Sequence, residues 1–198
     1  MKRVLMVIDM LNGFLEKGYN LSCGPQSREI VPFVRDKIGE YKESGDPVIF
    51  LCDSHDPDDK EFKIFGRHCV TGSHEAEIID ELKPLAVGEI LLPKKKHLDF
   101  FTPELDEMLR RFAPDIVELV GVCTNICIFF AAEDLRKRDY KVRVYERGVA
   151  SFDPEAHKYA LDQMRKVLAV EVVSEEPNGS PEDEHQGREA AAAERVRT

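Results

Sequence analysis

The sequence lacks the features that direct a protein into or across a membrane. No apolar stretch approaches the roughly 18–20 residues of a membrane span. The apolar run at the N-terminus stops at Asp9 with no small-residue cleavage site, so it is typical of a strand and not of a signal peptide. We therefore expect a cytoplasmic protein with no membrane partner.

A disulfide scaffold and a nucleic-acid footprint are also disfavoured. The five cysteines are odd in number and form no CxxC pair, which favours reduced thiols in a cytosolic protein. The formal net charge is −10, and the one dense basic run, Lys94 to Lys96, is too short to bind a polyanion. We therefore expect no nucleic-acid partner.

The chain does have the alternation of an α/β protein. Short apolar runs alternate with segments of helical periodicity. The expected strands are 4–8, 48–52, 89–92, 116–120, 140–145 and 167–173. The expected helices are 27–43, 103–112, 126–138 and one that begins at Asp153-Pro154. This order predicts a doubly wound, mostly parallel six-stranded sheet with helices on both faces, a three-layer α/β/α fold.

Two segments depart from this rhythm. Residues 53–74 are polar and rich in Asp and His, and long connections of this kind are often functional. From Ser174 onward the chain has almost no large apolar residues. We therefore expect one domain over 1–173 and a disordered acidic and Ala-rich tail over 174–198.

Polar residues gather where the expected strands end. In open parallel sheets, sites form beyond the carboxyl ends of the strands. Asp9 follows the first strand, Asp53 and His55 follow the second, the lysine run follows the third, and Cys127 follows the fourth at a turn into a helix. An acid, a lysine and a cysteine therefore meet at one edge.

Cys127 is the candidate nucleophile. A helix N-terminus and a nearby lysine lower the pKa of a thiol, and free backbone N–H groups can hold the oxyanion of a tetrahedral intermediate. Asp9 could pass the thiol proton to the leaving group. The alternative is a buried, unreactive thiol, the usual state of a free cysteine. The other cysteines are assigned to that state: Cys23, Cys52, Cys69 and Cys123.

The polar connection also predicts a divalent metal site. Imidazole and carboxylate ligands suit zinc, with iron or manganese as alternatives. The candidate ligands are Asp53, His55, His68 and, as a fourth, Glu61. The alternative is a solvated acidic loop with incidental histidines, since a D-x-H pattern alone is not specific. Phe14 and Phe65 lie in loops near these clusters and could flank a flat ring, although without the rest of the site loop packing is the better explanation.

Four blocks of the chain resemble the isochorismatase-like cysteine hydrolases, and among them the nicotinamidases. The blocks are VIDMLNGF at 7–14, DSH at 53–55 with EFKIFGRHCVTG at 61–72, PKKKHLDFF at 93–101, and GVCTNIC at 121–127. The resemblance implies a catalytic triad of Asp9, a lysine and Cys127, and a homo-oligomer. It also implies a cis peptide between Val122 and Cys123, beside an oxyanion hole made by the N–H groups of Cys123 and Cys127.

The resemblance leaves the triad lysine open between two neighbours. Counting back from Asp99 and from Phe101 gives Lys95, whereas alignment on Phe100 gives Lys94. Lys95 is preferred because two features agree on it.

The leading hypothesis is a nicotinamidase, which converts nicotinamide and water to nicotinate and ammonia through a thioester on Cys127. It rests on the complete metal set, which many relatives lack. A hydrolase of another small amide or carbamoyl-amide would keep the same chemistry. A non-catalytic metal- or ligand-binding protein is a third reading, and an isochorismatase proper is disfavoured because it needs no nucleophilic cysteine.

Overall fold

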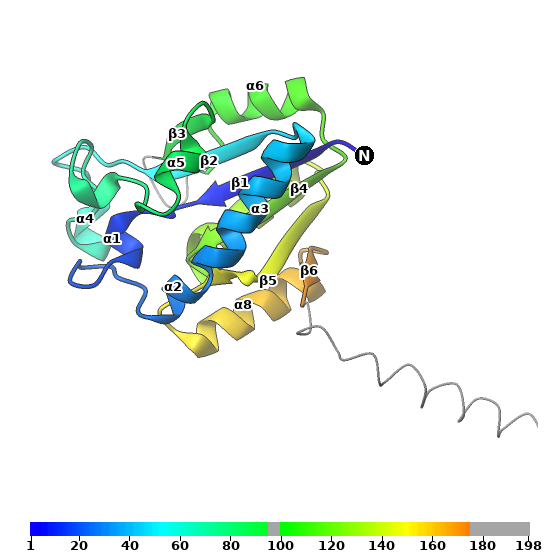
Figure 1. Cartoon of the computed structure of the whole chain (residues 1–198). Coiled ribbons are helices and arrows are strands. Elements are labelled where there is room, and N and C mark those ends of the chain that lie inside the picture. The colour runs from blue at the N-terminus through cyan, green and yellow to red at the C-terminus, as the bar shows by residue number, and fades with distance from the viewer. Residues whose placement is uncertain (95–99, 175–198) are drawn as a thin grey trace, which may run out of the picture.

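A single sheet organises the molecule. The computed structural model describes residues 1–94 and 100–174. The strands are β1 (Arg3–Ile8), β2 (Val48–Asp53), β3 (Ile90–Lys94), β4 (Ile116–Val122), β5 (Val142–Ala150) and β6 (Glu171–Val173). Their order is β3-β2-β1-β4-β5-β6, and every pairing is parallel, which confirms the predicted fold (Figure 1). The expected tail lies almost wholly outside the described residues.

Two hydrophobic cores form because alternate residues of a strand face opposite sides of the sheet. On β1, Val4, Met6 and Ile8 face one core, and Leu5 and Val7 face the other. The first core is covered by α6 (Pro103–Phe112), α7 (Phe129–Lys137) and α8 (Pro154–Lys166). The second is covered by α3 (Val31–Ser44) and α5 (Lys83–Ala86). The short helix α2 (Gln26–Glu29) precedes α3. Helices therefore lie on both faces, as predicted.

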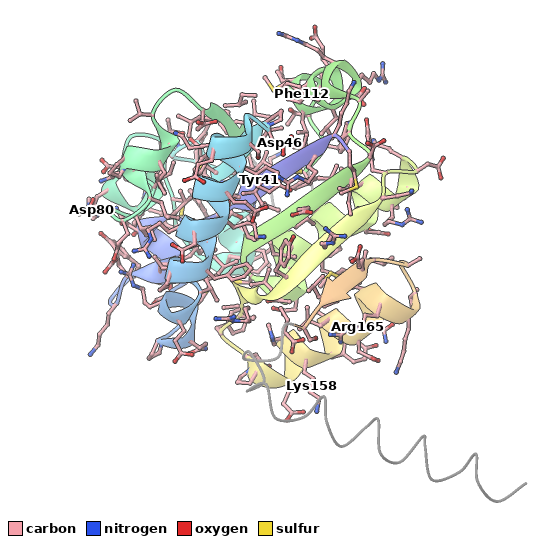
Figure 2. All side chains as sticks on the ribbon, turned by 45° about the vertical axis from the view of Figure 1, so that its right-hand side comes forward. Tyr41, Asp46, Asp80, Phe112, Lys158 and Arg165 are labelled. Atoms are coloured by element: carbon pink, nitrogen blue, oxygen red, sulfur yellow. The ribbon has the colours of Figure 1, made fainter. Side chains whose placement is uncertain are left out.

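Side-chain burial follows the same division. Tyr41 on α3 is fully buried between that helix and the sheet, whereas Lys158 and Arg165 on α8 are exposed (Figure 2). The short elements are α1 (Asn12–Leu15), α4 (Phe62–Phe65), the 3₁₀ turn His74–Ala76 and the π-helical turn Thr124–Ile128. Within the described ranges, no helix is long and apolar enough to span a membrane.

Several predicted boundaries were wrong. The expected helix at 27–43 is two helices that meet at Ile30, because Pro32 lies in the first turn of α3 and cannot continue the hydrogen bonds of α2. The expected strand at 167–173 begins only at Glu171, since Ala169 has a left-handed φ of 53°. The expected strand at 140–145 runs on to Ala150.

Candidate active site

The carboxyl ends of four neighbouring strands, β3, β2, β1 and β4, place the candidate residues side by side. Asp9 directly follows β1, Asp53 and Lys94 end β2 and β3, and Cys127 follows β4. The strands are in parallel register, with Ile8 opposite Leu51 and Gly121, and with Asp53 opposite Lys94. The short helices α1 and α4 lie beyond this end of the sheet (Figure 1). Parallel pairing therefore brings together residues that are over 100 positions apart in the chain.

Lys94 is the lysine that the structure brings to this site. Its Nζ lies 3.2 Å from Asp9 Oδ2 and 3.7 Å from Cys127 Sγ, and it donates a short hydrogen bond to Asp53. The side chain is 1% exposed. Burial opposes the charge, but the Asp53 and Asp9 carboxylates raise the pKa of Lys94 well above its usual value. The buried ammonium is therefore paired, as a buried charge must be.

Lys95, which the sequence favoured, lies outside the described residues. The two alignments differed in which phenylalanine marks the motif. Phe100 is 1% exposed and belongs to the core, whereas Phe101 is only partly buried. Phe100 is therefore the residue in the buried position, and alignment on it favours Lys94 as the candidate triad lysine.

The buried carboxyl of Asp9 has a raised pKa. Its Oδ1 accepts a hydrogen bond of 2.9 Å from the backbone N–H of Asp53. Burial, and then the negative charge of Asp53, raise the pKa of Asp9 to about 6, although Lys94 acts in the opposite direction. Burial would also raise the pKa of Asp53, but Lys94, His55 and His68 together outweigh burial and hold that pKa well below its usual range.

The expected low thiol pKa of Cys127 is wrong for this site. Cys127 is 7% exposed, and burial raises the pKa of its thiol well above the ordinary value. Lys94 lowers this pKa, but it does not outweigh burial and the charges of Asp9 and Asp53. The Asp9 carboxylate and the Cys127 thiol are close enough for each to shift the pKa of the other. The resting thiol therefore keeps its proton and has a carboxylate beside it that can accept it.

The turn that carries Cys127 depends on close contact between β4 and β1. The Val122–Cys123 peptide is cis, the configuration that the resemblance implied. Gly121 has a φ of 121°, and a Cβ there would lie 2.0 Å from the carbonyl oxygen of Ile8. Only glycine fits this position. Cys127 follows in a π-helical turn, where leading N–H groups have no earlier carbonyl within the helix.

Three candidate metal ligands converge next to this triad. The DSH segment pairs with the HCV segment through a parallel bridge between His55 and Val70, which brings His68 beside His55. One ligand atom each from Asp53, His55 and His68 lies within 4.8 Å of the others, and all three residues are buried. The Nε2 atoms of His55 and His68 lie 3.6 and 3.7 Å from Asp53 Oδ2.

These three residues fit a divalent cation. Nε2 of His55 is buried and has no hydrogen-bond partner among the described residues. Nδ1 of His68 is bound to the carbonyl oxygen of Gly66 at 2.9 Å, so its Nε2 is left for a ligand. Buried nitrogen and oxygen atoms that converge in this way suit zinc, iron or manganese. Glu61 is outside this group of three but lines the same cavity.

A cavity of about 280 Å³ is lined by Asp9 and Cys127 and by the candidate metal ligands Asp53, His68 and Glu61. Phe14 and Phe65 both line it, as the sequence suggested. Sequence reasoning missed five further lining residues, because their side chains offer no acid, base, nucleophile or metal ligand that would single them out: Asn20, Leu21, Ser22, Ile126 and Phe152.

Comparison with known proteins gives consistent results. The family model described as the isochorismatase domain matches residues 3–176. A nicotinamidase/pyrazinamidase structure from Bacillus subtilis has a TM-score of 0.83 at 30% identity, and covers 88% of this chain and 100% of that one. An N-carbamoylsarcosine amidase structure from Thermoplasma acidophilum has a TM-score of 0.78 at 35% identity, covering 90% and 100%. Nicotinamidase 1 of Arabidopsis thaliana is 29% identical over 174 residues, 77% of this chain and 71% of that protein.

Proposed function

The chain belongs to the isochorismatase domain family, and from this premise we propose that it is a metal-assisted cysteine amidohydrolase that converts nicotinamide and water to nicotinate and ammonia. One observation carries the proposal: a small cavity is lined both by Cys127 with its acid partner and by the ligands of a candidate metal site. The homo-oligomer and the cytoplasmic location expected from the sequence remain predictions.

The proposed reaction begins at the Cys127 thiol. Its sulfur attacks the carboxamide carbon while Asp9 takes the thiol proton, and the tetrahedral oxyanion is held by backbone N–H groups at Cys123 and Cys127. Asp9 then gives the proton to the departing ammonia, which leaves a thioester. Water hydrolyses this thioester, with Asp9 as the base. Lys94 keeps its positive charge throughout and stabilises the negative charge that moves between sulfur and carboxylate.

Asp53, His55 and His68 would hold the metal, with Glu61 as a further candidate. A divalent ion held by these residues would supply Lewis acidity toward the ring nitrogen of the substrate. Phe14 and Phe65 line the same cavity and would flank the ring. Since ligand cavities are commonly about 300–1,000 Å³, this one is at the small end and suits a single-ring amide.

Ammonia release from nicotinamide by the zinc-loaded protein tests the proposal. Benzamide is the matched control substrate, because it has the same shape but no ring nitrogen. We expect turnover of nicotinamide, at least about 100-fold lower kcat/KM with benzamide, and no turnover by Cys127→Ala. A protein that binds zinc but releases no ammonia from nicotinamide would refute the substrate.

A second candidate keeps the chemistry and changes the substrate to a carbamoyl-amide. It is favoured by the similarity to the N-carbamoylsarcosine amidase structure at 35% identity. The same ammonia assay with N-carbamoylsarcosine separates the two candidates. A non-catalytic binding protein, the third reading, predicts that neither substrate is turned over.

A further inference from the structure

Asp59 lies behind the candidate metal ligands and contacts two residues of the segment that carries them. Its Oδ2 is 3.2 Å from Nδ1 of His55. Its Oδ1 accepts a hydrogen bond of 2.8 Å from the backbone N–H of Glu61. The Asp59 side chain is 13% exposed and that of His55 is fully buried. One carboxylate therefore receives two donors from the metal-binding segment.

This contact determines which nitrogen of His55 carries the hydrogen. An ionised carboxylate only accepts hydrogen bonds, so Nδ1 of a neutral His55 must be the N–H donor. Its Nε2 then keeps a lone pair and lies 3.6 Å from Asp53 Oδ2, in the group of candidate metal ligands. That same Nε2 has no hydrogen-bond partner among the residues that the structure describes.

We propose that Asp59 is a positioning residue that holds His55 in the tautomer and orientation required to bind a divalent metal. The inference rests on the metal site of the proposed function and adds a residue that touches neither metal nor substrate. Such partners behind a metal-bound histidine typically change metal affinity by about 10–100-fold.

The two histidines of the site differ in which group accepts the hydrogen bond from Nδ1. His68 uses a backbone acceptor, the carbonyl oxygen of Gly66, which no substitution removes. His55 uses a side chain, so its partner can be changed by mutation. Asp58, the preceding residue, is exposed and has the same charge, and it is therefore a matched control.

Asp59→Asn is a sharper substitution than Asp59→Ala. Asparagine has one acceptor oxygen, but Glu61 N–H and His55 Nδ1–H both need an acceptor. If the oxygen stays on Glu61, the amide NH₂ faces His55 and favours the opposite tautomer, with the hydrogen on Nε2. That hydrogen would occupy the direction in which the metal binds.

The experiment measures the Zn²⁺ dissociation constant of the full chain by competition with a chromophoric chelator. We expect Asp59→Asn to bind zinc about 10–100-fold more weakly than wild type, and Asp58→Asn to stay within about twofold of wild type. Asp59→Glu, which keeps a carboxylate, is expected to recover part of the affinity. Equal zinc affinity in Asp59→Asn and Asp58→Asn would overturn the inference.

The same measurement separates this inference from the proposed function. Zinc affinity that depends on Asp59 in a protein that does not hydrolyse nicotinamide would support the role of Asp59 and refute the substrate. Zinc affinity unchanged by Asp53→Asn would refute the metal site and the role of Asp59 together. Urea unfolding of each variant in excess chelator shows whether the fold is intact. If Asp59→Asn is unfolded, the zinc affinities of Asp59→Glu and Asp58→Asn are compared instead. Equal zinc affinities of those two variants would likewise overturn the inference.

Discussion

Replacing Lys94 with methionine removes the ammonium between two buried carboxylates and keeps most of the apolar stem. In the structure, Asp9 and Asp53 are 1% and 3% exposed and share Lys94 as their cation. Breaking a buried ion pair typically costs about 3–5 kcal/mol, because the remaining charge is left without a partner. Asp9 can take up a proton, since its pKa is already raised to about 6, and this reduces the cost. We therefore expect the free energy of unfolding to fall by at most about 3–5 kcal/mol.

In the proposed mechanism, protonation of Asp9 also removes the base that accepts the Cys127 proton. When residues act as one catalytic unit, removing any one of them typically lowers the kcat of the enzyme by at least about 10³-fold. Because small proteins are stable by about 5–15 kcal/mol, Lys94→Met should remain folded in most of this range, so the loss of activity is measurable.

The assay combines urea unfolding with ammonia release from nicotinamide, for Lys94→Met and for Lys95→Met. Lys95→Met is the control for charge and composition, and we expect it to change stability by less than about 0.5 kcal/mol and to keep its activity. An active Lys94→Met protein beside an inactive Lys95→Met protein would refute the assignment of the triad lysine.

Two further predictions concern the thiol and the close approach of β4 to β1. The rate of Cys127 alkylation by iodoacetamide, followed by mass spectrometry, should reach half its maximum at a pH above the ordinary thiol pKa of about 8.5, because burial raises the pKa of this thiol. Lys94→Met should move that pH midpoint higher still. A midpoint at or below about 8.5 in the wild-type protein would contradict this prediction. Gly121→Ala should lower the free energy of unfolding by about 3 kcal/mol, because the added Cβ would meet the backbone of Ile8. Gly39→Ala, in open space on α3, should raise the free energy of unfolding by about 0.5–1 kcal/mol. Equal urea midpoints for the two variants would refute the steric argument.

Local signals predicted those elements whose ends are specified by neighbouring residues. α6 occupies 103–112 as predicted, because Thr102 caps it by accepting from Leu105 N–H and Pro103 begins it. Asp153 caps α8 in the same way, and accepts hydrogen bonds from two backbone N–H groups. The predicted start of the strand at residue 167 was wrong, because the apolar run there continues through the turn between α8 and β6. Val170 in that turn is buried like a strand residue, but the strand begins only at Glu171.

The site shows the same division between local pattern and spatial arrangement. The sequence alone determined the fold class, the strand ends and most of the candidate chemistry: Asp9, Cys127 and the Asp53, His55 and His68 set. These follow from hydrophobic periodicity and from the motifs that close each strand, and both are local.

Only the tertiary structure shows that Lys94 lies between Asp9 and Asp53, and that burial raises the pKa of the Cys127 thiol. Adjacent lysines have the same local chemistry, and only the register of β3 against β2 places Lys94 opposite Asp53. The thiol pKa depends on burial by segments far apart in the chain, and burial outweighs the lysine beside it. Both outcomes depend on what surrounds a side chain in space, which sequence neighbours do not specify.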